Sequence, residues 1–263
     1  MPLRSMNKTT IISTWITEPQ WADGWPMVHH PDQVPRPSVW LIDSAHTHIV
    51  FGGRCDRVLS EAELARAARF HQAAHRIRYK ATHTVLRMLL AAGTHADAAD
   101  LHFHSGHHNK PNLSDNQDLS TTFNLSYTEN KSMIGVAEGR AIGVDIEWLN
   151  RPIAIADMLT ACFSANEIDY ITAQEDDMRR RFFTLWTRKE AILKLTGEGI
   201  GEHLPFFEVL DGSRITQKEI IGGNPPNTIY LYSFHIDEGY VGCYASSEAQ
   251  ERLPLYRLRE LQT

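Results

Sequence analysis

The sequence predicts an α+β fold in which an N-terminal extension precedes two similar α/β halves. Short apolar runs with the period of a strand alternate with longer stretches that have the period of a helix. Two S-x-x-E capping boxes, at Ser60 and Ser164, stand 104 residues apart. The helices expected after them end at Gly93 and Gly197, which are also 104 residues apart. Matches that recur in order at one offset indicate a duplicated unit.

These patterns give an element order that repeats. The capping boxes begin helices at 60–69 and 164–173, glycines end the helices at 73–92 and 178–196, and a turn at 224–227 precedes a hairpin centred on 237–239. Alternating apolar residues predict the strands. We expect strands at 38–43, 101–104, 121–126, 132–138, 141–147, 205–210, 228–236 and 239–245, with a further helix at 155–160.

Three segments follow from this order. Residues 1–37 carry prolines and tryptophans without clear periodicity, so we expect a loosely structured extension. The two halves are expected at 38–140 and 141–263, with a ligand at the seam between them. The N-terminus lacks the apolar run of a signal peptide. No segment approaches the roughly 18 apolar residues that span a membrane.

Composition excludes several classes of protein. A chain of 263 residues with 42% hydrophobic content can bury a sizeable core. A net charge of −6 argues against nucleic-acid binding by bulk charge. The three cysteines are far apart and form no CxxC, so neither a zinc site nor a disulfide framework is indicated. We therefore expect a cytoplasmic protein without nucleic-acid or membrane partners.

Two carboxylates mark the expected strand at 141–147. Alternation places Val144 and Ile146 on its buried face, and Asp145 and Glu147 together on the other, about 7 Å apart. Two hard oxygen ligands at this spacing suit Mg²⁺. Taken alone, the D-x-E pattern is more typical of an edge strand with a solvated face.

The helix expected at 178–196 favours the metal site over the solvated edge strand. Trp186, Glu190 and Lys194 share one stripe, and Lys189 lies beside it. The alternative is an ordinary amphipathic helix with a Glu190–Lys194 surface pair. A tryptophan on the charged stripe favours the wall of a cleft. Three acids beside two cations indicate a divalent metal that holds a phosphate ester.

The first half offers cations and a hydroxyl for an anion. A basic helical region includes Arg66 and Arg78, Lys110 follows a histidine-rich loop, and Ser126 ends a strand. Each has a simpler explanation, because basic clusters are usually solvated faces and strand-end serines are common. Read alone, none of them establishes a phosphate site.

Together these motifs resemble the Sfp-type 4′-phosphopantetheinyl transferase family. The resemblance spans about residues 38–245. It rests on Gly143-Val144-Asp145-Ile146-Glu147, Phe163-Ser164-x-x-Glu167, Phe183-x-x-Trp186-x-x-Lys189-Glu190-Ala191-x-x-Lys194-x-x-Gly197-x-Gly199 and, more weakly, Asn109-Lys110-Pro111 and Phe123-Asn124-Leu125-Ser126. It implies two pseudo-twofold-related α/β subdomains. It also implies a Mg²⁺-dependent enzyme that moves the 4′-phosphopantetheine arm of coenzyme A onto a serine of an apo acyl or peptidyl carrier protein and releases 3′,5′-ADP.

The resemblance also implies roles for particular residues. Asp145, Glu147 and Glu190 would hold Mg²⁺, either Glu190 or Glu147 would act as the general base, and Lys194 would bind the pyrophosphate and assist the leaving phosphate. Coenzyme A would be bound by Arg66, Arg78, Lys110, Ser126, Tyr127, Lys189 and Lys194. Tyr127 stands where the family usually has histidine, so this chain lacks a positive charge at that position.

Two alternatives remain beside this interpretation. One is a non-catalytic module that binds coenzyme A or a carrier protein on the same fold. The other is a Mg²⁺-dependent phosphohydrolase, although no nucleophile or water-positioning motif is visible. Two fused halves favour a monomer. The sequence does not indicate which carrier protein is modified.

Overall fold

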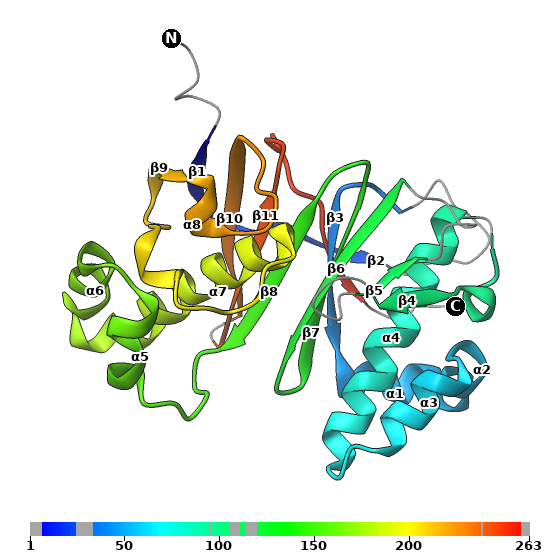
Figure 1. Ribbon diagram of the computed structural model, residues 1–263. Coiled ribbons are helices and arrows are strands. Elements are labelled where there is room, and N and C mark those ends of the chain that lie inside the picture. Colours follow the sequence, from blue (N-terminus) through cyan, green and yellow to red (C-terminus); the bar gives the residue numbers. More distant parts are fainter. Residues whose placement is uncertain are drawn as a thin grey trace. The chain divides into compact units, whose positions relative to one another are not determined.

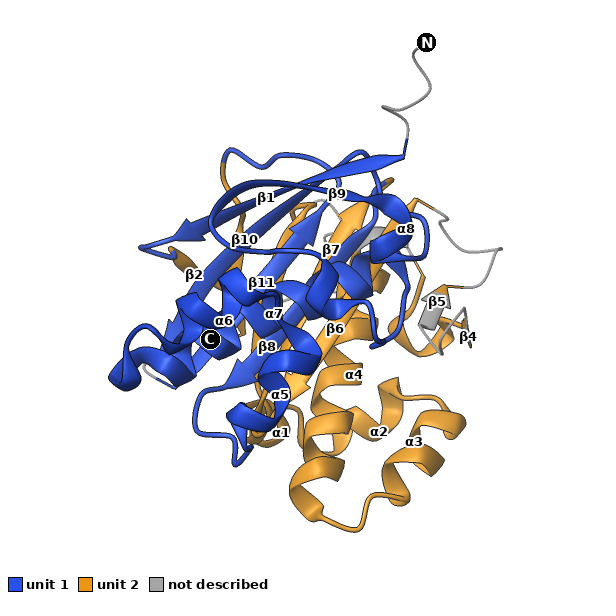
Figure 2. Cartoon of the chain, turned by 60° about the vertical axis from the view of Figure 1, so that its left-hand side comes forward, with its two compact units in different colours: residues 1–19, 140–251 blue, residues 20–139, 252–263 orange. Residues whose placement is uncertain are grey.

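The structure is a computed structural model that describes residues 7–24, 34–94, 96–105, 111–113, 120–237 and 239–258. It contains two compact units, coloured separately in Figure 2. Unit 1 comprises residues 1–19 and 140–251, and unit 2 comprises residues 20–139 and 252–263. Both units combine helices with a mixed sheet, so the predicted α+β class is confirmed.

Unit 1 is built on a five-stranded sheet with the order β8-β11-β10-β1-β9 (Figure 1). Helix α7 packs against β8 and β11 of this sheet. The elements of unit 1 are β1 (Lys8–Ile16), β8 (Ile142–Trp148), α5 (Ile155–Cys162), α6 (Ala165–Thr172), α7 (Met178–Thr196), β9 (Gly212–Gln217), α8 (Lys218–Ile221), β10 (Thr228–Asp237) and β11 (Tyr240–Ser246).

The core of unit 1 lies between α7 and the sheet. Phe182, Phe183 and Leu193 of α7 are buried in one cluster with Ile11 of β1 and Val241 of β11. Helix α7 ends at the residue that the sequence predicts, because the following Gly197 takes a φ of 76°, which side chains disfavour. The apolar side of α7 therefore fixes the position of its charged residues.

Unit 2 has its own five-stranded sheet with the order β2-β12-β3-β7-β6, and α4 packs against β7. Helix α4 continues through the predicted end at Gly93 to Thr94. The elements of unit 2 are β2 (Trp21–Gly24), β3 (Ser38–Asp43), α1 (Ser44–Phe51), α2 (Cys55–Val58), α3 (Glu61–Ala68), α4 (Ala73–Thr94), β4 (Phe103–Ser105), β5 (Pro111–Leu113), β6 (Thr121–Thr128), β7 (Lys131–Glu138) and β12 (Leu255–Leu258).

The internal repeat is visible in the elements. Helices α3 and α6 both begin with a complete capping box, at Ser60 and Ser164. Each unit also contains an antiparallel ladder of three strands, β3-β7-β6 in unit 2 and β8-β11-β10 in unit 1. The two ladders follow the same chain order around their helices, as the offset of 104 residues predicts.

The expected loose extension is wrong for the residues that the structure describes in it. Lys8–Ile16 form β1, which pairs in parallel with β10 and antiparallel with β9. At the other end of the chain, β12 pairs in parallel with β2 and β3. Because each terminal strand completes a sheet, the units are discontinuous, unlike the three consecutive segments that we expected.

The strand expected at 205–210 is also wrong. Residues 204–206 form a 3-10 turn, and β9 begins only at Gly212. Lys189 Nζ donates to the carbonyls of Leu204 and Phe207, and Glu167 accepts from the amide of Val209. Side chains therefore occupy backbone groups that a strand would pair with a neighbour.

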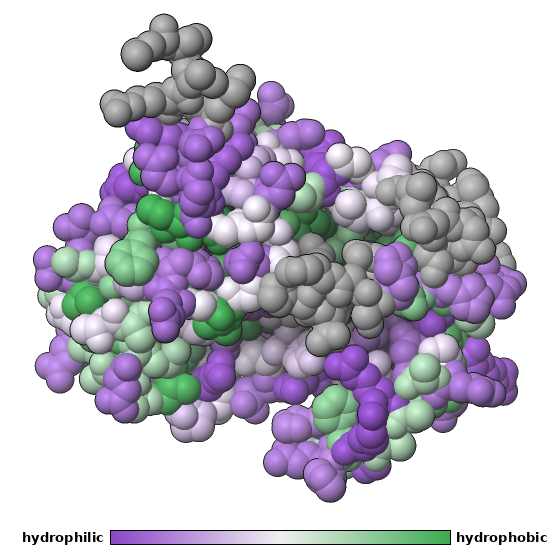
Figure 3. All heavy atoms as spheres, in the orientation of Figure 1, coloured by the Kyte–Doolittle hydropathy of each residue, from purple (hydrophilic) through white to green (hydrophobic). Residues whose placement is uncertain are grey.

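The surface carries both hydrophobic and hydrophilic residues (Figure 3). On the face drawn in Figure 3, hydrophobic residues lie in separate patches among hydrophilic ones. None of the helices in the described ranges has the length and apolar character that crossing a membrane requires.

Candidate active site

Strand β8 carries two acidic residues into a buried environment. Asp145 and Glu147 alternate with Val144 and Ile146, as the sequence predicts. β8 is an edge strand, but the solvated acidic face that the D-x-E pattern suggests is not observed, since Asp145 is 4% exposed and Glu147 is 7% exposed. Buried carboxylates need cations or hydrogen-bond donors close by.

Gly143 allows α7 to approach β8 closely. A Cβ atom at this position would lie 2.0 Å from the carbonyl oxygen of Ala191 and 2.7 Å from the amide nitrogen of Leu195. Only a residue without a side chain fits this contact. The close approach brings the charged stripe of α7 to the acids of β8.

Two cations neutralise the acids of β8. Lys194 Nζ of α7 lies 2.7 Å from Asp145 Oδ1. Arg151, four residues after Glu147, donates from its guanidinium to Glu147 Oε1 at 2.7 Å. Sequence reasoning missed Arg151, because i, i+4 spacing pairs charges on a helix, and Glu147 lies near the end of a strand that is followed by a turn.

Glu190 completes the acidic cluster. Its Oε1 is buried and has no hydrogen-bond partner among the described residues. Burial raises the pKa of Glu190 to about 7, helped by the charges of Asp145 and Glu147 and opposed by those of Lys194 and Arg151. The structure thus brings together Asp145, Glu147, Glu190 and Lys194, four of the residues that the sequence predicts.

The donor set fits a divalent cation, because three carboxylates supply the hard oxygens that Mg²⁺ prefers. The buried Oε1 of Glu190 retains capacity for a ligand. In the described ranges, however, no three His, Cys, Asp or Glu side chains form a ready-made metal site. Lys194 holds one oxygen of Asp145, and Arg151 holds one oxygen of Glu147. The chemistry of a metal site is present, and its ligand geometry is not formed.

The residues predicted for coenzyme A in the first half lie in unit 2. Arg78 places its guanidinium 4.8 Å from the ring centre of Tyr127 and donates to the carbonyl of Glu129. Burial lowers the pKa of Arg78. The neighbouring Ser126 is buried on β6. Lys110 lies outside the described residues.

Known proteins resemble the part of the chain that carries this cluster. A family model described as the 4′-phosphopantetheinyl transferase superfamily matches residues 141–245. The 4′-phosphopantetheinyl transferase HetI of Nostoc sp. is 34% identical over 146 residues, which cover 55% of this chain and 62% of that protein. A putative 4′-phosphopantetheinyl transferase of Synechocystis sp. is 30% identical over 168 residues, which cover 64% of this chain and 67% of that protein.

The chain belongs to the 4′-phosphopantetheinyl transferase superfamily. The Bacillus subtilis transferase Sfp is also similar, at 26% identity over 67% of this chain and 78% of that protein. The alignment with HetI covers less than two thirds of HetI. The match to the superfamily includes Asp145, Glu147, Glu190 and Lys194 and leaves unit 2 outside it.

One residue of the superfamily-like motif does not join the cluster. Lys189 was predicted to bind coenzyme A, but its side chain is fully buried and its Nζ lies 2.8 Å from Glu167 Oε2. Burial lowers the pKa of Lys189, and the charge of Glu167 opposes that shift. With two backbone carbonyls also bound to Nζ, Lys189 fastens the segment at 204–207 to α6 and α7. The predicted contact with coenzyme A is therefore replaced by a structural role.

Trp186 likewise contributes to packing. It is partly buried against the core of unit 1, and its ring stacks on Phe182 with centroids 6.2 Å apart. The stripe shared with Glu190 is thus apolar at Trp186 and ionic one turn later.

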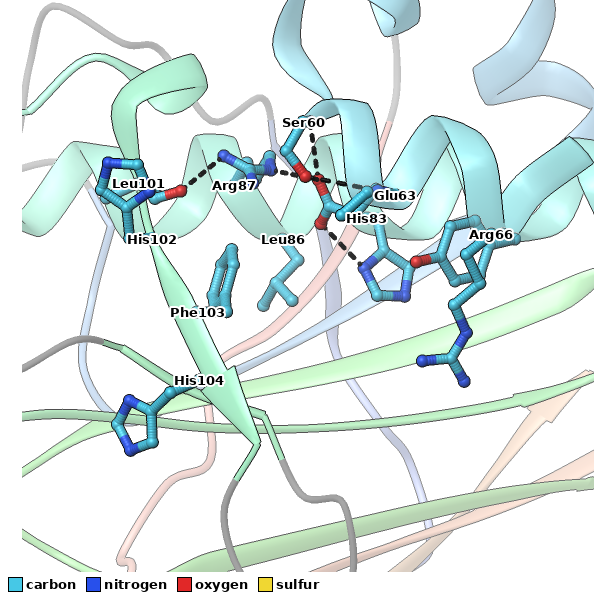
Figure 4. A pocket seen from close by; sticks show the side chains of 12 residues that line it. Ser60, Glu63, Arg66, His83, Leu86, Arg87, Leu101, His102, Phe103 and His104 are labelled. Carbon is cyan, nitrogen blue, oxygen red and sulfur yellow. Dashed lines mark hydrogen bonds and ion pairs between the residues drawn. The ribbon is translucent and has the colours of Figure 1, made fainter.

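Arg66 borders a cavity of about 400 Å³ in unit 2 (Figure 4). Sequence reasoning missed the acid in its wall. Glu63 accepts from Arg87 Nε at 2.8 Å and lies 3.3 Å from His83 Nδ1. Burial would raise the pKa of Glu63, but hydrogen bonds from His83 and the Ser60 amide and the charge of Arg87 lower it to about 2. Glu63, His83 and Arg87 pair with one another, whereas Arg66 is exposed.

Proposed function

We propose that this protein transfers the 4′-phosphopantetheine arm of coenzyme A to a serine of an apo acyl or peptidyl carrier protein, with Mg²⁺, and releases 3′,5′-ADP. Membership of the superfamily supports the reaction class. The observation that carries the proposal is the gathering of Asp145, Glu147, Glu190 and Lys194 where α7 crosses β8. We further propose that it works as a monomer in the cytoplasm.

The reaction is a phosphoryl transfer. The serine hydroxyl oxygen of the carrier attacks the phosphorus that bears the pantetheine arm, the bond from this phosphorus to the oxygen of 3′,5′-ADP breaks, and the serine proton passes to a base. Such transfers depend mainly on positioning and on stabilising charge. A cluster of fixed acids and cations suits this demand better than a covalent nucleophile.

Glu190 is the better candidate for the base. A base needs an oxygen that can accept the proton, and the buried Oε1 of Glu190 accepts no hydrogen bond from the described residues. Glu147 is the weaker candidate, because in the metal-free structure its Oε1 already accepts a hydrogen bond from Arg151. We assign proton abstraction from the serine to Glu190.

Lys194 is positioned to neutralise the leaving group. Asp145 holds its ammonium at 2.7 Å, while the Lys194 side chain keeps 26% of its surface exposed. A half-open ammonium of this kind can contact a phosphate without leaving its partner. We assign to Lys194 the stabilisation of the phosphate that departs as part of 3′,5′-ADP.

Asp145, Glu147 and Glu190 would hold Mg²⁺, which would supply positive charge to the pyrophosphate. The adenosine 3′-phosphate end of coenzyme A would be bound by Arg66, Arg78, Lys110, Ser126 and Tyr127. The exposed ring of Tyr127 and the guanidinium over it offer stacking and charge for that end.

Mass spectrometry of an apo carrier protein tests the proposal. The carrier is incubated with this protein, coenzyme A and Mg²⁺. A gain in carrier mass equal to one phosphopantetheinyl group is the expected result. Binding of coenzyme A or carrier without any mass gain would identify a non-catalytic module. Phosphate release in the absence of carrier would identify a phosphohydrolase.

A further inference from the structure

The side chain of Arg151 closes the acidic cluster on its more exposed side. The Glu147 side chain keeps only 9% of its surface exposed, whereas the Arg151 side chain keeps 47%. Arg151 therefore approaches the buried Glu147 carboxylate from the solvent. Its charge also acts on Glu190.

The backbone around Arg151 is held by hydrogen bonds. Arg179, in the first turn of α7, donates from Nε to the carbonyl of Leu149 at 2.9 Å and from Nη2 to the carbonyl of Arg151. The amide of Leu149 donates to the carbonyl of Gly239. These hydrogen bonds hold the backbone at Leu149 and Arg151, so the side chain of Arg151 is the part that can move.

The charges of the cluster explain what such a movement would do. Within the described part of the chain, the carboxylates of Asp145, Glu147 and Glu190 interact with the cations Lys194 and Arg151. A divalent cation added to this set would meet two positive charges that already hold its oxygens. The half-exposed Arg151 pair is the weaker of the two, because solvent screens it and its guanidinium can be rehydrated.

We propose that Arg151 is a displaceable counter-ion of Glu147, which exchanges its guanidinium for the divalent cation when the metal binds. This inference rests on the proposed metal-dependent function. In the metal-free protein the guanidinium neutralises Glu147 and thereby limits repulsion among the buried acids. On loading, Arg151 returns to solvent on its fixed backbone and sets the affinity of the cation by competing with it.

Isothermal titration with Mg²⁺ alone, without coenzyme A or carrier, provides the first test. Arg151→Gln should bind Mg²⁺ at least 3-fold more tightly than the unmodified protein. Arg140→Gln is the matched control, because Arg140 forms an ion pair of the same 2.7 Å length with Glu248 in the same unit. The control should leave Mg²⁺ affinity within 1.5-fold. Equal affinities for all three proteins would overturn the proposal and leave the metal-dependent function standing.

A second readout follows the side chain itself. The NMR signal of Arg151 Nε–Hε, assigned by its loss in Arg151→Gln, should move toward the position of a solvated arginine as Mg²⁺ saturates the protein. A signal that stays in place at saturation would refute the exchange. Absence of Mg²⁺ binding to any of the proteins would contradict the metal site and this proposal together, whatever the carrier assay shows.

Discussion

Lys194 Nζ lies 2.7 Å from Asp145 Oδ1, so a cation of α7 and an acid of β8 form one ionic unit in the part of the chain that matches the superfamily. Asp145→Asn keeps the shape of the side chain and removes its charge. We expect phosphopantetheine transfer to fall about 100-fold or more, because both the cation ligand and the partner of Lys194 are lost.

The readout is the initial rate of mass gain of an apo carrier protein. The matched control is Arg140→Gln, which alters an ion pair elsewhere in unit 1 and should transfer at the normal rate. Transfer by Asp145→Asn within about 3-fold of normal would contradict the role assigned to this acid.

The raised pKa of Glu190 predicts how stability depends on pH in the absence of metal. Its pKa of about 7 in the folded protein exceeds the ordinary glutamate value of 4.5, so the folded state holds its proton more tightly than the unfolded chain. The associated stability is complete below pH 4.5 and is lost as the pH rises through 7. The loss amounts to at most about 3 kcal/mol.

Urea unfolding in EDTA at pH 5 and pH 8 measures this dependence. The unmodified protein should lose stability over that interval, and Glu190→Gln should lose less. Parallel losses in the two proteins would show that Glu190 does not carry a raised pKa.

Gly143 predicts a steric requirement. In Gly143→Ala the new Cβ would overlap the carbonyl oxygen of Ala191, and backbone atoms on both elements would have to shift. We expect a loss of about 3 kcal/mol in the free energy of unfolding. Gly53→Ala is the control, since a Cβ there meets nothing within 4 Å. Equal stability of the two variants would rule out the tight contact between β8 and α7.

Because Lys189 and Glu167 form a buried pair, a change at Lys189 should reduce stability without weakening the binding of coenzyme A. Lys189→Met leaves Glu167 charged and unneutralised inside unit 1, which should cost about 3–5 kcal/mol. Lys189→Met combined with Glu167→Gln should recover part of that loss. Calorimetric affinity for coenzyme A, measured on folded protein, should be unchanged, and a weaker affinity would restore the predicted phosphate contact.

Tyr127 predicts a change in coenzyme A binding. Tyr127→His replaces a neutral ring beside Arg78 with one that can become cationic. Affinity for coenzyme A should increase, most strongly below the ordinary histidine pKa of about 6.5, while affinity for the form lacking the 3′-phosphate should stay the same. Equal or weaker binding of coenzyme A by the histidine form would refute this prediction.

Residues with strong local signals were predicted from the sequence. The capping boxes at Ser60 and Ser164, the glycine after α7 and the alternation along β8 have local physical causes, and the structure contains all of them. The cluster of Asp145, Glu147, Glu190 and Lys194 followed from strand and helix periodicity, because α7 lies directly on β8.

Elements that depend on distant partners were missed. Two of the buried positions of β1 are Thr9 and Ser13, so its apolar alternation is weak, and its place in the sheet is set by pairing with β9 and β10 more than 190 residues away. The role of Lys189 depends on Glu167 and on carbonyls at 204 and 207, which no local pattern reveals.

The proposed function requires Asp145, Glu147 and Glu190 to hold one divalent cation at the crossing of β8 and α7. Anomalous diffraction from a crystal grown with Mn²⁺ and coenzyme A tests it most directly. We expect a single strong manganese peak bound by Asp145, Glu147 and Glu190, with a phosphate oxygen completing its ligands. A bound coenzyme A with no manganese at these carboxylates, or with manganese held elsewhere, would contradict it.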